Sequence, residues 1–343
     1  MNPGLVESAP DGPVYGTFRM FNPLKLFVKA LRLTTGWDKS EPNTPGGRPP
    51  VLVDATLGRA GHARILLEAH PELLLIGIDA DVTAIEAGRD LAARYPGQVT
   101  IAHAFYDRIG EIVAQAGHRR IQGALFDLGV SSPQLDDAGR GFSYAQDAPL
   151  DMRMDQTAEL TAERVVNTYP AGELARVLAE YGEERFARRI AAFIERERAR
   201  EPITSTLRLA AIVKDAIPAA ARRTGGNPAK RTFQGLRIEV NDELGALRRA
   251  VPAALDLLAP GGRFVALAYH SLEDRLVKRE LVARTADATP PGVPLRAADA
   301  AASGAPFRLL TRGAERPDEQ ELAANPRSAS VRLRAIERIR DST

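Results

Sequence analysis

The alternation of short apolar runs with helical segments constrains the fold of this chain more than any other feature. Four runs, at residues 51–58, 73–81, 99–105 and 123–129, are mainly apolar, and the segments 63–70 and 83–95 between them have helical character. Uniformly apolar strands are typical of a parallel sheet that is covered on both faces. Strands that alternate with helices predict βαβ units. The sequence therefore predicts an open α/β domain.

A long helical segment interrupts this alternation. From Leu135 to Gly226 the pattern is helical, and the alternation returns with a strand at 263–270. Residues 306–314 and 328–338 alternate in a way that predicts an antiparallel pair closing the sheet. We expect three parts: an N-terminal arm at 1–48 that is partly disordered, an α/β domain formed by 49–134 and 232–343, and an inserted helical domain at 135–231.

The composition excludes several kinds of protein. The chain has no cysteine, which excludes disulfides and thiolate metal sites and favours a cytoplasmic location. Its five histidines are scattered without a metal-binding spacing, so we expect no metal. No uninterrupted apolar stretch approaches the roughly 20 residues of a membrane span, and we expect no membrane association.

Basic residues are unevenly distributed, although the net charge is only +2. Between residues 218 and 237 the chain has no acidic residue, and its basic residues there are Arg222, Arg223, Lys230, Arg231 and Arg237. A second basic group lies between Arg188 and Arg200. Such groups suit RNA as a partner, but a solvated face is the commoner explanation, above all for the second group.

The segment DATLGRAGHA, residues 54–63, joins the first strand to the first helix. Ligands of open parallel sheets bind at the carboxyl ends of strands, where Gly58 and Gly61 allow the backbone to approach them. Asp79 closes the second strand and can accept hydrogen bonds from both ribose hydroxyls. The additional carboxylate of Asp54 disfavours a pyrophosphate and favours an ammonium or sulfonium. S-adenosylmethionine has both cations, a ribose and no phosphate, so we expect it as the cofactor.

The fourth strand ends at Asp127, and Ser131, Ser132 and Gln134 follow. The Asp127 carboxylate can accept a hydrogen bond from an adenine amine, a methionyl ammonium or a substrate N–H, and the residues alone leave these open. Phe105, at the end of the third strand, is a candidate to stack on adenine. The uncharged hydroxyl and amide groups suit the edge of a neutral base.

Long blocks of the chain closely resemble the ribosomal RNA small-subunit methyltransferase H family, also called MraW. The blocks occur in family order at 125–155, 181–191, 202–210, 227–244, 258–279 and 325–338. The resemblance implies a class I S-adenosylmethionine-dependent methyltransferase, Rossmann-like, with a mostly parallel seven-stranded sheet and an inserted helical domain that recognises the substrate. It implies methylation of N4 of a cytidine in the decoding centre of 16S rRNA, in the 30S subunit. The family's cofactor contacts fall on Ala60, Gly61, His62, Asp79, Phe105, Asp127 and Gln134.

The chain departs from the family pattern in the loop after the first strand. The family usually reads DGTFGxGGHS there, so Ala55 and Ala60 replace glycines and Ala63 replaces a serine. A side chain at Ala60 is tolerated if its φ is negative, whereas a positive φ would cost on the order of 1 kcal/mol. The family's N-terminal H-x-P-V-L block is also unmatched.

Methyl transfer to cytosine N4 depends on alignment more than on a strong base, because the amine becomes acidic only as the methyl group arrives. We expect Asp127, or the Ser131 and Ser132 hydroxyls with nearby carbonyls, to accept the N–H. His270, at the end of the strand 263–270, is a further candidate to face the pocket. The candidates for an aromatic ring that stacks the target base are Phe142, Tyr144 and Phe233.

Two other functions stay open. A cofactor-binding protein with weakened catalysis could act as a ribosome-assembly partner, which the alanines of the loop favour. A methyltransferase that acts on a small amine is the second, and the basic residues argue against it. A homodimer is possible.

Overall fold

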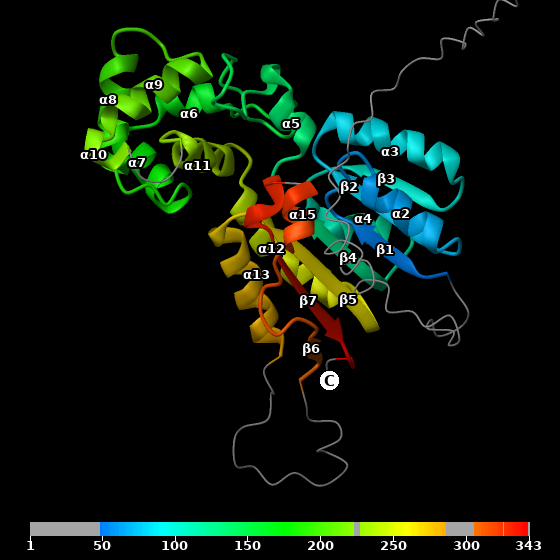
Figure 1. Ribbon diagram of the computed structural model, residues 1–343. Coiled ribbons are helices and arrows are strands. Elements are labelled where there is room, and N and C mark those ends of the chain that lie inside the picture. The colour runs from blue at the N-terminus through cyan, green and yellow to red at the C-terminus, as the bar shows by residue number, and fades with distance from the viewer. Residues whose placement is uncertain (1–48, 223–226, 286–304, 325, 342–343) are drawn as a thin grey trace, which may run out of the picture.

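The computed structural model describes residues 49–222, 227–285, 305–324 and 326–341 (Figure 1). The expected arm at 1–48 and Arg223 lie outside the described residues. One seven-stranded sheet has the order β3-β2-β1-β4-β5-β7-β6. Its strands are β1 (Val51–Asp54), β2 (Leu74–Asp79), β3 (Val99–His103), β4 (Ile121–Asp127), β5 (Leu258–Ala268), β6 (Phe307–Leu309) and β7 (Arg332–Arg338). Pairing is parallel from β3 to β5, and β7 runs antiparallel to both β5 and β6. The predicted Rossmann-like α/β sheet with its antiparallel closing pair is confirmed.

Helices cover both faces of this sheet, as the uniformly apolar strands predict. Side chains alternate along each strand, so Val51 and Val53 belong to one apolar cluster and Leu52 belongs to the other. The first cluster packs against α4 (Ile109–Gln115), α12 (Glu243–Leu257) and α13 (Ser271–Arg284). The second packs against α2 (Gly61–Ala69) and α3 (Val82–Arg94). The one-turn helix η1 (Tyr106–Arg108) follows β3.

The first strand ends at Asp54, where the expected loop at 54–63 begins, and Gly58 and Ala60 in this loop have positive φ. Strand β5 begins at Leu258, ahead of the predicted start at residue 263, and it contains the Pro-Gly-Gly segment at 260–262. The register of β5 against β4 shifts at this segment, between Ile121 and Gly123.

A separate helical unit lies to one side of the sheet (Figure 1). Its members are α6 (Ala162–Thr168), α7 (Ala171–Glu180), α8 (Ala187–Arg198), α9 (Thr206–Ala216), α10 (Ala219–Arg222) and α11 (Lys230–Val240). The helices α5 (Ser132–Asp136) and η2 (Ala138–Arg140) lead into it, and α15 (Glu319–Ala324) and η3 (Pro326–Ser330) precede β7. The unit has its own apolar cluster, which includes Phe233 and Leu236 of α11. This cluster therefore includes residues beyond 231, the residue at which we expected the inserted helical domain to end.

The helical prediction for 135–226 holds only in part. Residues 141–161 contain no helix, and Gly141 and Met152 in this stretch have positive φ. The long pattern that spans α7 and α8 is broken at Gly182 and Glu183, where Glu183 has φ 50. A Cβ at Gly182 would lie 2.4 Å from the Arg231 carbonyl oxygen, so close packing requires glycine there. Among the described residues, no helix is long and apolar enough to cross a membrane.

Candidate active site

Three adjacent strands each end on a carboxylate at the same edge of the sheet. Strand β1 lies between β2 and β4, and it ends at Asp54, level with Gly77 of β2 and Leu125 of β4. Asp79 and Asp127 are the last residues of those two neighbouring strands. The structure therefore brings together the three carboxylates that the sequence analysis placed at one rim.

Asp54 is the most buried of the three. Its side chain has no solvent exposure, Oδ1 accepts a hydrogen bond from Thr56 N–H at 3.3 Å, and Oδ2 accepts none from the described residues. Burial raises the pKa of Asp54 to about 7; the Thr56 N–H opposes this, and the negative charges of Asp127 and Asp79 add to it. This edge thus holds more negative charge than its own hydrogen bonds compensate, which favours a cationic ligand.

Asp79 ties the end of β2 to the loop after β1. Its Oδ2 accepts from Gly58 N–H at 2.8 Å, and Oδ1 accepts from Asp81 N–H at 2.9 Å. Burial raises the Asp79 pKa, and these backbone hydrogen bonds oppose the rise. Each carboxylate oxygen still has a lone pair for a ribose hydroxyl. Phe105, half-buried, follows closely, because Ala104 N–H donates to the Asp79 carbonyl at 2.9 Å.

The loop carries backbone strain at Ala60. This residue has φ 57 and ψ 25, the left-handed region that we identified as costly, and it caps α2 without a side-chain hydrogen bond. Its methyl group is buried in the apolar cluster under α2. Gly58 has φ 51, and a Cβ there would meet only the Thr56 carbonyl at 4.0 Å. Gly61 begins α2. The loop is thus compatible with a ligand over Gly58, with the Ala60 methyl turned into the core.

His62, in α2, and Tyr269, which follows β5, both approach Asp127. Tyr269 O–H donates to Asp127 Oδ1 at 2.9 Å, and His62 Nδ1 lies 3.9 Å from Oδ2. Burial raises the Asp127 pKa to about 6, the Tyr269 hydrogen bond opposes the rise, and the charge of Glu273 adds to it. Burial also lowers the His62 pKa to about 4, so His62 is neutral at pH 7. Sequence reasoning missed Tyr269, although its position next to His270 was a signal for it.

Ser131 and Gln134 are engaged with each other. They form a capping box at the start of α5: Ser131 N–H donates to Gln134 Oε1 at 2.9 Å, and Ser131 Oγ accepts from Gln134 N–H at 3.5 Å. Ser132 is the first residue of α5. Gln134 Nε2 also donates to Asp81 Oδ2 at 2.9 Å, and Arg140 NH1 donates to the same oxygen at 2.7 Å. The Arg140 and Asp81 side chains are only 6% and 3% exposed, and sequence reasoning missed this buried pair.

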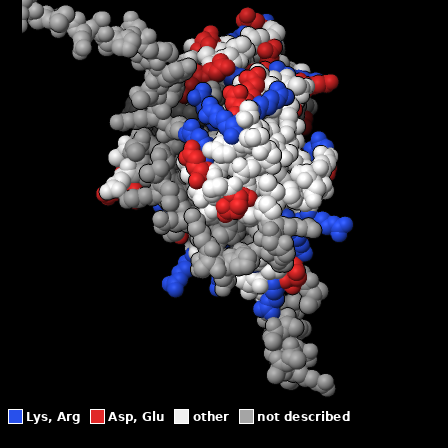
Figure 2. All heavy atoms as spheres, turned by 90° about the vertical axis from the view of Figure 1, so that its right-hand side faces the viewer, with Lys and Arg blue, Asp and Glu red and all other residues white. Residues whose placement is uncertain are grey.

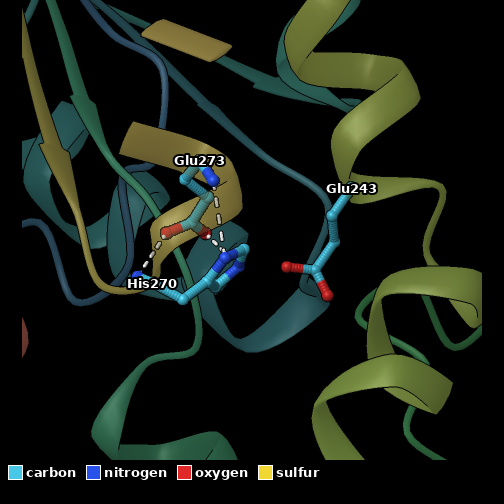
Figure 3. A group of neighbouring side chains, drawn as sticks. All are labelled: Glu243, His270 and Glu273. Carbon is cyan, nitrogen blue, oxygen red and sulfur yellow. Dashed lines mark hydrogen bonds and ion pairs between the residues drawn. The ribbon is translucent and has the colours of Figure 1, made fainter. Parts of the chain in front are cut away.

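His270 belongs to a cluster of charged residues beside the rim (Figure 3). It is the N-cap of α13, and its Nε2 lies 3.1 Å from Glu273 Oε1. Glu243 points toward the His270 ring, and the ligand-type atoms of these three residues lie within 4.8 Å of one another. Arg237 already donates to both oxygens of Glu243, at 2.7 and 2.8 Å. A guanidinium therefore supplies the positive charge that a metal ion would bring, and we assign no metal here.

The expected RNA-binding residues differ in their surroundings. Lys230 and Arg231 are exposed at the start of α11, and Arg231 NH1 donates to the Glu183 carbonyl at 3.0 Å. The Arg237 side chain is only 15% exposed and is bound to Glu243, so it is engaged inside the protein. Arg222 lies in α10. The rings offered as stacking candidates pack in the core of the helical unit: Phe142, Tyr144 and Phe233 belong to its apolar cluster, and Tyr144 and Phe233 make an edge contact at 5.5 Å.

Comparison with known proteins agrees with this geometry. The MraW methylase family model matches residues 28–339. A Thermobifida fusca protein, "Ribosomal RNA small subunit methyltransferase H", is 59% identical over 291 residues, which are 85% of this chain and 87% of that protein. A protein of the same name from Frankia alni is 60% identical over 289 residues, 84% of this chain and 88% of that protein. The family model covers most of the sheet and the helical unit together, and this chain belongs to the MraW methylase family.

Proposed function

We propose that this chain transfers a methyl group from S-adenosylmethionine to N4 of a cytidine in the decoding centre of 16S rRNA. The observation that carries the proposal is the row of Asp79, Asp54 and Asp127 at the ends of three adjacent strands, with Asp54 buried and one of its oxygens without a described partner. Family membership and relatives named for small-subunit rRNA support the choice of substrate.

The residues present fit this cofactor. When bound, S-adenosylmethionine would supply an activated methyl group on a positively charged sulfur. Asp79 is placed to accept from ribose hydroxyls beside the loop, and Asp54 suits an ammonium group because its Oδ2 accepts no described hydrogen bond. A positive charge at this edge would relieve the repulsion among the carboxylates, which raises the Asp54 pKa.

Asp127 is the residue that we assign to the target amine. Its Oδ1 is fixed by Tyr269, and its side chain is 25% exposed, so Oδ2 faces a partly open space next to neutral His62. A carboxylate oriented in this way can accept the N4–H and hold the amine in line. Such positioning can supply several kcal/mol, up to roughly 7–11 kcal/mol in favourable systems. Ser131 is a weaker candidate, because its hydroxyl already caps α5.

The test is methyl transfer from labelled S-adenosylmethionine to 30S subunits, naked 16S rRNA and free cytidine, followed by mass spectrometry of the nucleosides. We expect N4-methylcytidine in the rRNA and none from free cytidine. Transfer to free cytidine at a comparable rate would favour the small-amine methyltransferase instead.

A cofactor-binding assembly partner with weakened catalysis is the second candidate, and the positive φ of Ala60 favours it. Calorimetric titration with S-adenosylmethionine, combined with the methyl-transfer assay, distinguishes the enzyme from the assembly partner. Tight binding of S-adenosylmethionine without methyl transfer to any rRNA substrate would support the assembly partner. The helical unit would recognise the RNA in either case, with Lys230 and Arg231 as contacts, and a homodimer and a cytoplasmic location stay predictions.

A further inference from the structure

Three arginines at and just before the start of α8 have no carboxylate partner in the part of the chain that the structure describes. Arg185, Arg188 and Arg189 are exposed, and no carboxylate of the described residues forms an ion pair with them. The other arginines of this segment are used: Arg196 and Arg200 pair with Glu197, and Arg198 donates to the carbonyls of Val166 and Tyr169. The arginines near the start of α8 therefore lack a carboxylate partner among the described residues, whereas those near its end are bound to a carboxylate or to backbone carbonyls.

Aromatic rings lie among these arginines. The Arg189 and Arg196 guanidinium carbons lie 5.6 and 4.2 Å from the centroid of the half-buried Phe193 ring, and the Arg185 guanidinium lies 5.3 Å from the Phe186 ring. Residues 189, 193 and 196 lie on one face of α8, and Arg185 and Phe186 lie in the turn that precedes the helix. Phe186 and Phe193 also pack against the apolar cluster of the helical unit, and both rings are only half-buried. Unpaired nucleotides bind where basic groups meet their phosphates and rings stack on their bases.

This surface is connected to the rim of the candidate active site. The loop before α8 contacts the start of α13, because Ser271 Oγ donates to Glu183 Oε2 and Arg275 NH2 donates to Glu183 Oε1 at 3.2 Å. Arg231 binds the carbonyl of the same Glu183. Helix α13 starts two residues after Tyr269, the partner of Asp127. Glu183 therefore holds Arg231 and Arg275 beside the segment that leads into α8.

The opposite side of the molecule has a different character. On the face shown in Figure 2, which is the right-hand side of Figure 1, acidic and basic side chains are interspersed around an uncharged area. Exposed arginines of α3, Arg89 and Arg94, lie outside both the site and the helical unit. They provide a matched control for α8.

We propose that Arg185, Arg188 and Arg189, with the rings of Phe186 and Phe193, bind a single-stranded segment of rRNA away from the nucleotide that is methylated. This surface, which we call the α8 surface, deepens the proposed function and rests on it for the identity of the RNA. Its arginines contact phosphates and its rings stack on exposed bases, so it binds without reading the sequence.

The test is fluorescence anisotropy of a labelled single-stranded oligoribonucleotide, and of a duplex with the same sequence, at several salt concentrations. In the double variant Arg188→Gln/Arg189→Gln, we expect single-strand affinity to fall about tenfold. The slope of log K against log salt should fall in magnitude by about 1.4, because each lost phosphate contact removes about 0.7 from it. The control Arg89→Gln/Arg94→Gln removes the same charge and should leave both quantities unchanged.

Phe193 tests the stacking part of the proposal. We expect Phe193→Leu to lower single-strand affinity about fivefold or more without changing the salt slope, and Phe193→Tyr to retain affinity because the ring is kept. Thermal unfolding of each variant shows whether the fold is intact.

Three results would overturn the α8 surface: equal affinities of the two double variants, no RNA binding by the unmodified protein, or loss of binding to 30S subunits with oligonucleotide binding retained. The last result would mean that α8 contacts a ribosomal protein. The proposed function is judged separately, by methyl incorporation at saturating 30S subunits. RNA binding that depends on α8 in a chain that transfers no methyl group would contradict the proposed function and leave the α8 surface standing.

Discussion

The sheet edge carries buried negative charges, whereas the α8 surface carries exposed positive charges. At the sheet edge, Asp54 is fully buried and repelled by its neighbours, whereas Arg188 and Arg189 on α8 are exposed and unpaired. Electrostatic interactions are strong where water is excluded and screened where it is not. The buried carboxylates are therefore suited to one small cation in a fixed place, and the exposed arginines to a long polyanion that many weak contacts hold.

A buried ion pair joins the sheet side of the molecule to the segment that leads into the helical unit, and breaking it should produce the largest effect. Arg140, which leads into the helical unit, binds Asp81 at the start of α3. We expect Arg140→Leu to lower the free energy of unfolding by about 3–5 kcal/mol, because it leaves a buried carboxylate without its cation. Urea denaturation measures the change. The control Arg108→Leu breaks an exposed pair with Glu111 and should lower the free energy of unfolding far less, because water screens an exposed pair; equal losses would show that burial makes no difference.

The proposed methyl transfer at the sheet edge depends on Asp127. We expect Asp127→Asn to lower kcat at least about a hundredfold at saturating cofactor and rRNA, because an amide accepts the N4–H less well than a carboxylate does. Single-turnover methyl transfer measures the change, and calorimetry measures cofactor affinity in the same variant. Asp90→Asn, on the exposed side of α3, is the control. Full turnover by Asp127→Asn would remove Asp127 from the reaction.

Tyr269 should affect the pH dependence more than the maximal rate. Its hydrogen bond lowers the Asp127 pKa, so Tyr269→Phe should raise that pKa further above about 6. The ionised Asp127 carboxylate is a much stronger acceptor than the protonated acid, so we expect activity to be lost as the pH falls through its pKa. We therefore expect the acid limb of kcat/KM to move to higher pH by about one unit, since a hydrogen bond to a charged group contributes roughly 1.5–3 kcal/mol.

Tyr106→Phe is the matched control for this shift. Tyr106 O–H donates to the Glu243 carbonyl rather than to Asp127, so the acid limb of this variant should stay in place. If Tyr269→Phe also leaves the limb unchanged, another group governs it, and Asp54, with a pKa of about 7, would be the first to examine.

The smallest effect is expected at Ala60. Relief of the left-handed strain favours Ala60→Gly by roughly 1–2 kcal/mol. The greater freedom of glycine in the unfolded chain opposes it by about 0.4–1 kcal/mol, so the net stabilisation should be about 1 kcal/mol or less. Gly58→Ala, at φ 51, is the reverse change and should destabilise the protein. Calorimetry on Ala60→Gly also shows whether the loop limits cofactor affinity; a destabilised Ala60→Gly would mean that the buried methyl contact outweighs the strain.

Local patterns were sufficient to predict the sheet and its row of carboxylates. Apolar runs and helical periodicity are properties of neighbouring residues, and a parallel sheet gathers the carboxyl ends of its strands by geometry. Asp54, Asp79 and Asp127 could thus be placed together from the sequence. The same reasoning treated residues 135–226 as one helical pattern and missed the break between α7 and α8, because the need for glycine at position 182 comes from packing against the distant Arg231 carbonyl.

The sequence by itself determined the class of fold, the carboxylates of the site and the presence of two basic groups. The tertiary structure alone decided which charges are available. Arg237 and Arg140 are bound to Glu243 and Asp81, whereas Arg188 and Arg189 have no such partner among the described residues. Tyr269 reaches Asp127 across 142 positions of the chain. The physical reason is that the effect of a charged or polar group depends on its burial and its partners, and residues far apart in sequence supply both.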